Sequence, residues 1–510
     1  MLLSRKVPFA VLAFSLLAFP SFAAEKTSLT IYSSAAPGSL SPEMYRPMPN
    51  GEGGGWMYGS QIPGYAYVRA QRDIDLKSGA NEVKFSDVAA YIDPTTVMFK
   101  SLSDPTGTTV QEQNYQFDLV SSQKLLDRYI GQDITVEQDH GTTVEGFAGK
   151  LLSANGGLIL QDKDGKVTSI NNYADIKFPE LPGGLITKPT LVWSVLAGKA
   201  GKQSVETSYQ TGGITWWADY NATYSEGKDA NSGFLDLGAW VSIVNKSGAS
   251  YDDAGLKLVA GDVHRATNGM AGRGMSVGAM AAAKSVDAAA GFAEKAFFEF
   301  HLYTLGRSTT IPDNSTKQIE LFPKVTHVPV QKEFVYYGAM MPYYGGVNTA
   351  REDGVPENKK VSIYLTFKND KKLGLGMPLP AGRVRVSKQD EADGSLEFIG
   401  EDTIDHTPKD EDVRIKLGEA FDITGERKQT DFAVDNARRT MSESFEITLK
   451  NHKDSDAEVL VKENLYRGAN WEITEASGDY KKLDAQTIQF PVTVKKDGTT
   501  KVTYTVRYTW

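Results

Sequence analysis

The sequence predicts an all-β protein made of tandem β-sandwich (immunoglobulin-like) domains, with one small barrel of the SH3 or Sm type. Apolar and polar residues alternate in many short runs, which places one face of a strand on a core and the other in water. Clusters of Gly, Asn and Asp separate these runs and are typical of turns. Five or more such runs within about 70 residues at the carboxyl end favour a sandwich.

Residues 1–23 have the three parts of a secretory signal peptide. Arg5 and Lys6 precede an apolar run over 7–19, and Ser21-Phe22-Ala23 supplies the small residues of a cleavage site. We therefore expect an exported protein.

Cysteine is absent from the sequence, which excludes disulfides, zinc–thiolate sites and thiol catalysis. A cysteine-free exported protein suits the periplasm of a Gram-negative bacterium. The 64 Asp and Glu residues outnumber the 55 Lys and Arg residues, and the net charge is −9. This dispersed acidic charge argues against nucleic acid as the main partner. Beyond the leader no run of about 18 apolar residues occurs, so we expect no integral membrane anchor.

We expect an N-terminal β-sandwich over 24–129 with a long loop at 36–64, followed by a small five-stranded barrel over 130–180. Five short apolar runs predict the strands of the barrel: 134–136, 144–152, 158–160, 167–170 and 176–178. Asn155-Gly156 has the composition of a hairpin turn. The segment is acidic, so its Sm-like pattern does not predict RNA binding.

A central β domain is expected over 185–437 and a C-terminal immunoglobulin-like sandwich over 438–510. In the central domain, Val361, Ile363 and Leu365 alternate strictly with other residues. The last strand repeats the pattern at Val502, Tyr504, Val506, Tyr508 and Trp510. A linker at 265–292 rich in Gly, Ala and Met interrupts the central domain, and its composition predicts a disordered or transiently helical segment.

Several motifs are shared with a known family: GITWWADY at 213–220, LGLGMPLPAGRVRV at 373–386, FIGEDTIDHTPKDE at 398–411, and the closing Tyr-x-Val-x-Tyr-x-Trp strand. In these motifs the chain resembles the bacterial exported family that carries domain of unknown function 4139. The resemblance extends over nearly the whole chain after the leader. It implies an all-β exported protein and identifies no catalytic residue.

Methionine is concentrated in three segments that break the strand pattern, at 36–64, 265–292 and 339–357. They contain eight of the twelve methionines: Met44, Met48, Met57, Met270, Met275, Met280, Met340 and Met341. Flexible, polarisable methionine side chains suit an adaptable contact surface, which makes Met340 and Met341 candidate binding residues. Thioethers also bind Cu(I), so Met270, Met275 and Met280 are candidate copper ligands. Packing within the loops is the third interpretation.

Two aromatic pairs could stack on sugars, which makes Trp217, Tyr343 and Tyr344 further binding candidates. Alternation along a strand turns one of Trp216 and Trp217 inward. Core packing therefore competes with a binding role at this pair.

The densest group of titratable side chains lies at 401–411 and includes Glu401, Asp405 and His406. Acids beside a histidine can perform general acid–base catalysis, and these three are the candidate catalytic residues. The alternative is a loop between strands in which His406 bonds to the backbone. A G-x-S-x-G match at 274–278 lacks the α/β surroundings of a nucleophile elbow, and we interpret it as chance. No cofactor is predicted.

From these observations we expect a periplasmic, non-catalytic binding, scaffold or envelope-associated factor whose partner is a protein or a cell-envelope component. Recognition would use the three loops on a rigid scaffold. The first alternative is a hydrolase of envelope glycans or esters that uses Glu401, Asp405 or His406. The second is a Cu(I)-binding protein.

Overall fold

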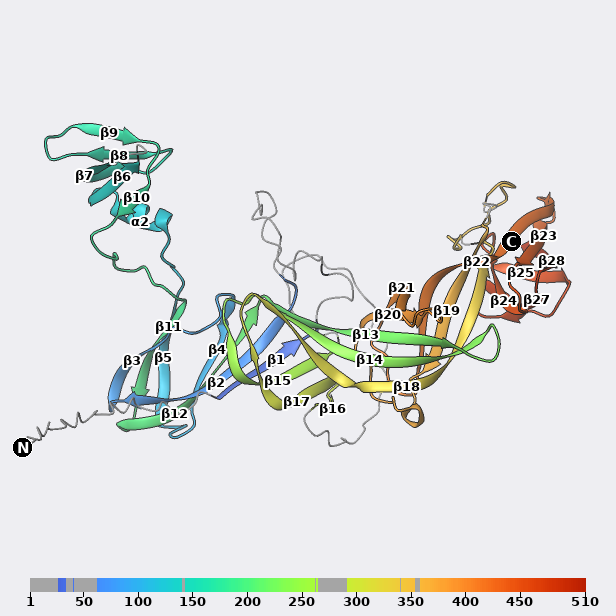
Figure 1. Cartoon of the computed structure of the whole chain (residues 1–510), viewed down its shortest axis with the longest axis horizontal. Coiled ribbons are helices and arrows are strands. Elements are labelled where there is room, and N and C mark those ends of the chain that lie inside the picture. The colour runs from blue at the N-terminus through green and yellow to red at the C-terminus, as the bar shows by residue number, and fades with distance from the viewer. Residues whose placement is uncertain are drawn as a thin grey trace, which may run out of the picture. The chain divides into compact units, whose positions relative to one another are not determined.

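The computed structural model describes residues 26–33, 40, 62–139, 143–261, 263–264, 291–339, 341–353 and 358–510 (Figure 1). The regular elements of the described residues are all strands, apart from helix α2 (Ser122–Tyr129) and the 3₁₀ turn η1 (Lys371–Leu373). The all-β prediction is therefore confirmed. The predicted linker at 265–292 falls almost wholly outside the described residues.

The chain divides into two compact units. The described part of the first consists mainly of Val68–Val88 and Asp93–Tyr209, and the second combines Leu29–Tyr67, Ala89–Ile92 and Gln210–Trp510. Each unit joins segments that are far apart in the sequence. The domain boundaries expected from the sequence stay predictions.

The first unit is a sandwich of two three-stranded layers. One layer has the order β3-β11-β5, from β3 (Gly79–Phe85), β11 (Thr190–Ala197) and β5 (Thr108–Gln116). The other has the order β2-β12-β4, from β2 (Tyr65–Leu76), β12 (Gly201–Gly212) and β4 (Ile92–Ser101). Trp193 of β11 is fully buried between them, with the rings of Phe85 and Phe99 at 4.6 and 5.1 Å from its own. This aromatic cluster is the centre of the core.

A five-stranded module is inserted between β5 and β11. Its order is β10-β6-β7-β8-β9, from β6 (Asp133–Asp139), β7 (Val144–Ser153), β8 (Leu158–Gln161), β9 (Val167–Ile170) and β10 (Asp175–Lys177). Leu126 and Tyr129 of α2 pack into its core. Because β5 and β11 are hydrogen-bonded neighbours, the chain leaves and re-enters the sandwich at one place. A short parallel bridge between Leu119 and Ile186 closes the base of the insertion.

The second unit is built on a long mixed sheet whose first part runs β21-β20-β13-β14-β18-β19-β22. The strands are β13 (Ile214–Glu226), β14 (Ser232–Asn245), β18 (Ser315–Tyr337), β19 (Lys360–Lys368), β20 (Gly382–Gln389), β21 (Leu396–Ile404) and β22 (Asp412–Asp435). β20 runs parallel to β13. The Lys416 amide of β22 donates to the Asp402 carboxylate of β21 at 2.7 Å, so the sheet curls until these two strands meet.

A second layer covers the inner face of β13. It contains β15 (Tyr251–Ala260), β16 (Phe292–Phe297) and β17 (Phe300–Ile311), with β17 between the other two. β1 (Lys26–Tyr32) ends beside β15, where the Ser33 amide donates to the Val259 carbonyl. Tyr303 of β17 packs edge-on against Trp216, with centroids 6.3 Å apart, and donates to the Pro378 carbonyl.

The carboxyl end forms a sandwich around one large apolar core. Its first layer extends β22 through β23 (Thr440–Asn451), β28 (Gly498–Thr509) and β25 (Asn470–Ala476). Its second layer is β24 (Ala457–Asn464), β27 (Thr487–Val494) and β26 (Lys481–Lys482), with β24 parallel to the end of β18. Val502, Tyr504, Val506 and Tyr508 all point into this core, as their alternation predicts.

Buried tyrosines make the fold sensitive to alkaline pH. Burial raises the pKa of Tyr224, Tyr251 and Tyr466 from 10.0 to about 12, and that of Tyr504 and Tyr303 well above 10.0. The unfolded chain loses these protons near pH 10, so their contribution to stability is complete below pH 10 and is lost as the pH rises through 12. We expect tyrosinate absorbance at these residues to appear together with loss of the β-sheet circular-dichroism signal. Reversible ionisation of all tyrosines with the sheet signal intact would contradict this expectation.

Candidate functional site

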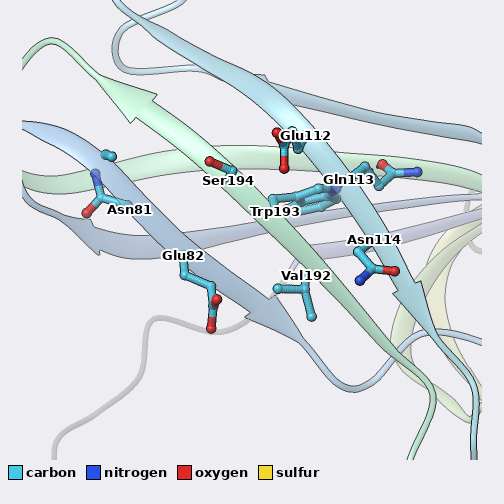
Figure 2. Close-up of a pocket in the computed structure, with 9 residues that line it drawn as sticks. Asn81, Glu82, Glu112, Gln113, Asn114, Val192, Trp193 and Ser194 are labelled. Carbon is cyan, nitrogen blue, oxygen red and sulfur yellow. Dashed lines mark hydrogen bonds between the residues drawn. The ribbon is translucent and has the colours of Figure 1, made fainter. Parts of the chain in front are cut away.

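A shallow hollow of about 800 Å³ lies on the three-stranded layer of the first unit. Figure 2 shows the residues that line it, from β3, β5 and β11: Ala80, Asn81, Glu82, Glu112, Gln113, Asn114, Val192, Trp193 and Ser194. We call it the β11 hollow. Its volume is in the range of small-molecule sites, although it is open to solvent along the sheet.

Strand register explains why the surface is hollow at this point. Ser194 on the central strand is paired with Glu82 on β3 and with Glu112 on β5. Directly paired residues share a face, so a short serine lies between two long acids. Under it, the Trp193 indole donates to the Gln113 side chain at 2.8 Å, and that amide donates to the Pro94 carbonyl at 2.8 Å. These bonds hold the floor of the β11 hollow in one conformation.

The β11 hollow is acidic and has the chemistry of a binding surface. Glu82 pairs with Lys84 at 2.9 Å, but both side chains are exposed, so the pair contributes little to stability. Glu112 makes no ion pair among the described residues. A serine nucleophile needs a base within hydrogen-bond reach, and in the described part of the chain Ser194 bonds to neither carboxylate. The arrangement suits a cationic or hydroxyl-rich ligand.

The second feature is a loop in the other unit, residues 341–353, which we call the Tyr344 loop. Arg467, which is fully buried, donates to the backbone carbonyls of Asn348, Ala350, Arg351 and Asp353 at 2.6 to 3.3 Å. These bonds fix the base of the loop.

Other contacts hold the Tyr344 loop to the same end of the sandwich. The Tyr466 hydroxyl donates to the Asp353 carbonyl at 2.6 Å, and the Asn348 amide donates to the Arg467 carbonyl at 2.9 Å. Val347 packs on the apolar core. These contacts attach residues 347–353 of the loop to the C-terminal sandwich.

The tip of the Tyr344 loop presents an aromatic side chain to solvent. Tyr344 is 82% exposed, whereas Tyr343 and Met341 are half-buried. Gly345 and Gly346 follow with φ of +85° and +78°, a conformation that costs glycine little and other residues more. Three of the predicted binding residues, Met341, Tyr343 and Tyr344, thus lie together on this loop. Met340 is outside the described residues.

The candidate catalytic residues at 401–411 each contact a different partner. Glu401 ion-pairs with Arg385 of β20 at 3.4 Å, and Arg385 also contacts Asp219 of β13 at 3.4 Å. His406 accepts the Ala381 amide on Nδ1 at 3.0 Å, and the Asp405 carbonyl accepts from the Thr407 hydroxyl at 2.9 Å. Glu401, Asp405 and His406 do not line the β11 hollow. Their catalytic role stays a prediction.

Of the remaining candidate residues, Trp217 is packed in an apolar cluster, and the three methionines lie outside the described residues. Trp217 is 9% exposed and packs with Leu40, Ile62 and Val244. Met270, Met275 and Met280 lie outside the described residues, so copper binding stays a prediction. Within the described ranges, no group of three His, Asp or Glu side chains could hold a metal ion.

The buried charges of the C-terminal sandwich were not predicted from the sequence. Glu443 ion-pairs with Arg467 at 2.8 Å and accepts from the Gln429 side chain at 2.8 Å. Glu463 accepts from Arg427 at 3.1 Å and from the Tyr504 hydroxyl at 2.7 Å. All four charged side chains are almost completely buried.

A signal for these acids was present in the sequence. Glu443 lies between the inward residues Met441 and Phe445, and Glu463 continues the inward series of Val459 and Val461. A charge at an inward position of an alternating run predicts a buried partner, because an unpaired buried charge is too costly to retain.

Comparisons with known proteins found no match: no family model, no curated protein and no solved structure is similar to this chain. Among the described residues, none of the helices combines the length and apolar character needed to cross a bilayer. The fold is that of a multidomain all-β protein.

Proposed function

We propose that the chain is an exported, non-catalytic binding factor of the bacterial cell envelope that recognises a protein partner through the Tyr344 loop. The leader-like pattern at 1–23 supports export. The observation that carries the proposal is the contrast within the loop, whose base is held by buried Arg467 and whose tip exposes Tyr344.

This contrast favours recognition for an energetic reason. Binding costs free energy whenever a loop or side chain must be ordered, and a loop whose base is already fixed avoids part of that cost. Tyrosine offers a large surface with few rotatable bonds, and it is enriched among the residues that contribute most to protein interfaces. The half-buried Met341 and Tyr343 extend the contact surface beside it.

The same geometry gives less support to a hydrolase. Glycoside hydrolysis requires two carboxyl groups that face each other across the scissile bond. Glu401 is engaged with Arg385, and His406 holds the Ala381 backbone. These contacts agree with the second interpretation of residues 401–411, in which His406 bonds to the backbone in a loop between strands. We therefore favour binding as the function.

The test is photo-crosslinking from the tip of the loop. The full chain carries p-benzoylphenylalanine in place of Tyr344, and a matched chain carries it in place of Phe421, which is 94% exposed on β22. After irradiation in an envelope extract, we expect a partner that crosslinks from position 344 and not from position 421. The purified partner should then bind Tyr344→Ala about tenfold more weakly than wild type, as for an interface hot spot.

Either of two results would overturn the proposal. One is an identical set of crosslinked proteins from positions 344 and 421. The other is a partner whose affinity for Tyr344→Ala equals that for the unaltered chain. A circular-dichroism melt of each variant checks that the fold is retained.

A further inference from the structure

The outer face of β13, β14, β20 and β21 carries an exposed tryptophan among polar side chains. Trp240 of β14 is 39% exposed and is paired with Asp219 of β13 and with Glu320 of β18. Asp219 is paired in turn with Arg383 of the parallel strand β20. Because paired residues share a face, the row Arg383–Asp219–Trp240–Glu320 lies on one surface, which we call the Trp240 face.

A buried carboxylate fixes the centre of the Trp240 face. The Asp219 side chain is 8% exposed, accepts from the Ser242 hydroxyl at 2.6 Å and contacts Arg385 at 3.4 Å. The Gln318 amide donates to Ser242 at 3.0 Å, and Glu401 contacts Arg385 on its other side. This network crosses five strands and holds the guanidinium of Arg385 in place.

Other polar groups on the Trp240 face are free to bind a ligand. Within the described ranges, Arg383 makes no hydrogen bond or ion pair, and it is only half-buried. Glu320 of β18 and Asn221 of β13 are exposed. A guanidinium donor, a carboxylate acceptor and an amide therefore lie on the same face as the indole of Trp240.

We propose that the Trp240 face binds a neutral pyranose unit of an oligosaccharide. The apolar C–H face of the ring would stack on the indole, which is flat and partly exposed. Hydroxyl groups at the ring edge would accept from Arg383 and donate to Glu320. A few convergent polar groups around an apolar contact are the usual composition of a small-ligand site.

The charges on the Trp240 face favour a neutral sugar over an acidic one. Arg383 and Arg385 are accompanied by Asp219, Glu320 and Glu401. An anionic ring stacked on Trp240 would meet Glu320 directly, whereas a hydroxyl group can serve as both donor and acceptor. Neighbouring Trp217 was a predicted binding residue, but its side chain is packed among apolar residues.

The test is isothermal titration of the full chain with neutral oligosaccharides of β-linked glucose, α-linked glucose and β-linked N-acetylglucosamine. We expect at least one of them to bind. Trp240→Ala should weaken that binding by about tenfold, the upper range for an aromatic stacking contact. Arg383→Met should weaken it by about fivefold through loss of a charge-assisted hydrogen bond. The controls Phe421→Ala and Tyr344→Ala should bind within about twofold of wild type.

Absence of binding to all three oligosaccharides would overturn the proposal. So would a Trp240→Ala variant that binds as well as Phe421→Ala. The Tyr344→Ala control keeps this inference separate from the proposed protein-binding function, because a sugar site on the Trp240 face does not depend on that loop. Circular-dichroism melts establish that each variant is folded.

Discussion

Substitution of Arg467 by Met should lower the free energy of unfolding of the C-terminal sandwich by about 3–5 kcal/mol, the usual cost of removing one partner from a buried ion pair. Glu443 would stay buried without its cation, and the carbonyls of residues 348, 350, 351 and 353 would lose their donor. Methionine replaces only the aliphatic stem of arginine, so the empty volume of the guanidinium group adds to the loss of charge and hydrogen bonding.

The effect should depend on pH in a definite direction. Burial raises the pKa of Glu443 above its ordinary 4.5, although Arg467 opposes the shift. Without Arg467 the folded-state pKa rises further, so the folded protein holds a proton that the unfolded chain has released. Stability is then lost as pH rises from 4.5. We therefore expect the cost of Arg467→Met to be larger at neutral pH than near pH 4.5.

Hydrogen–deuterium exchange of β23 and β28 in the full chain measures this free energy locally. The matched control is Lys501→Met, which removes an exposed ion pair to Glu446 at 2.9 Å on the same sandwich. That variant should change the free energy by less than about 1 kcal/mol. Equal losses in Arg467→Met and Lys501→Met would show that the buried pair is not a major source of stability.

The second large effect concerns Arg427 and Glu463. Arg427→Met leaves Glu463 buried without its cation, and Glu463→Gln leaves the buried charge of Arg427 without its carboxylate, so each single variant should lose about 3–5 kcal/mol. The double variant contains neither charge and keeps an acceptor for the Tyr504 hydroxyl, which donates to Glu463 at 2.7 Å. It should therefore be more stable than either single variant.

A double-mutant cycle on the same exchange measurement gives the coupling energy. Arg427 also lies over the Phe445 ring, 3.6 Å from its centroid, so part of the loss in Arg427→Met is lost packing that the double variant does not restore. Additive losses from the two single changes would contradict strong coupling between the charges.

Local sequence patterns predicted much of the strand content. Alternation at Val502, Tyr504, Val506 and Tyr508 identifies inward positions whatever the partner strand, because successive side chains on any strand point to opposite faces. The same reasoning applies to Val361 and Leu365, both buried on β19. The pattern does not say which strands pair.

For the candidate sites too, local sequence predicts single residues and does not predict which distant residues lie beside them. Sequence composition selected Tyr343 and Tyr344 as aromatic candidates, but the base of their loop is held by Arg467, more than one hundred residues further along the chain. Trp240 was not among the binding residues predicted from the sequence, because its row with Arg383 and Glu320 exists only when β13, β14, β18 and β20 lie side by side. Glu443 and Glu463 could have been noticed at inward positions, although their partners could not.

Alternation along the chain is enough to predict an all-β protein and the faces of strands such as β28, since side-chain alternation is a property of each strand alone. Three features become visible only in the folded protein: β20 pairs in parallel with β13, a five-stranded module is inserted between β5 and β11, and four charges are paired inside the C-terminal sandwich. These features join residues far apart in the chain. Their free energy comes from contacts that form only when distant strands meet, so no local pattern contains them.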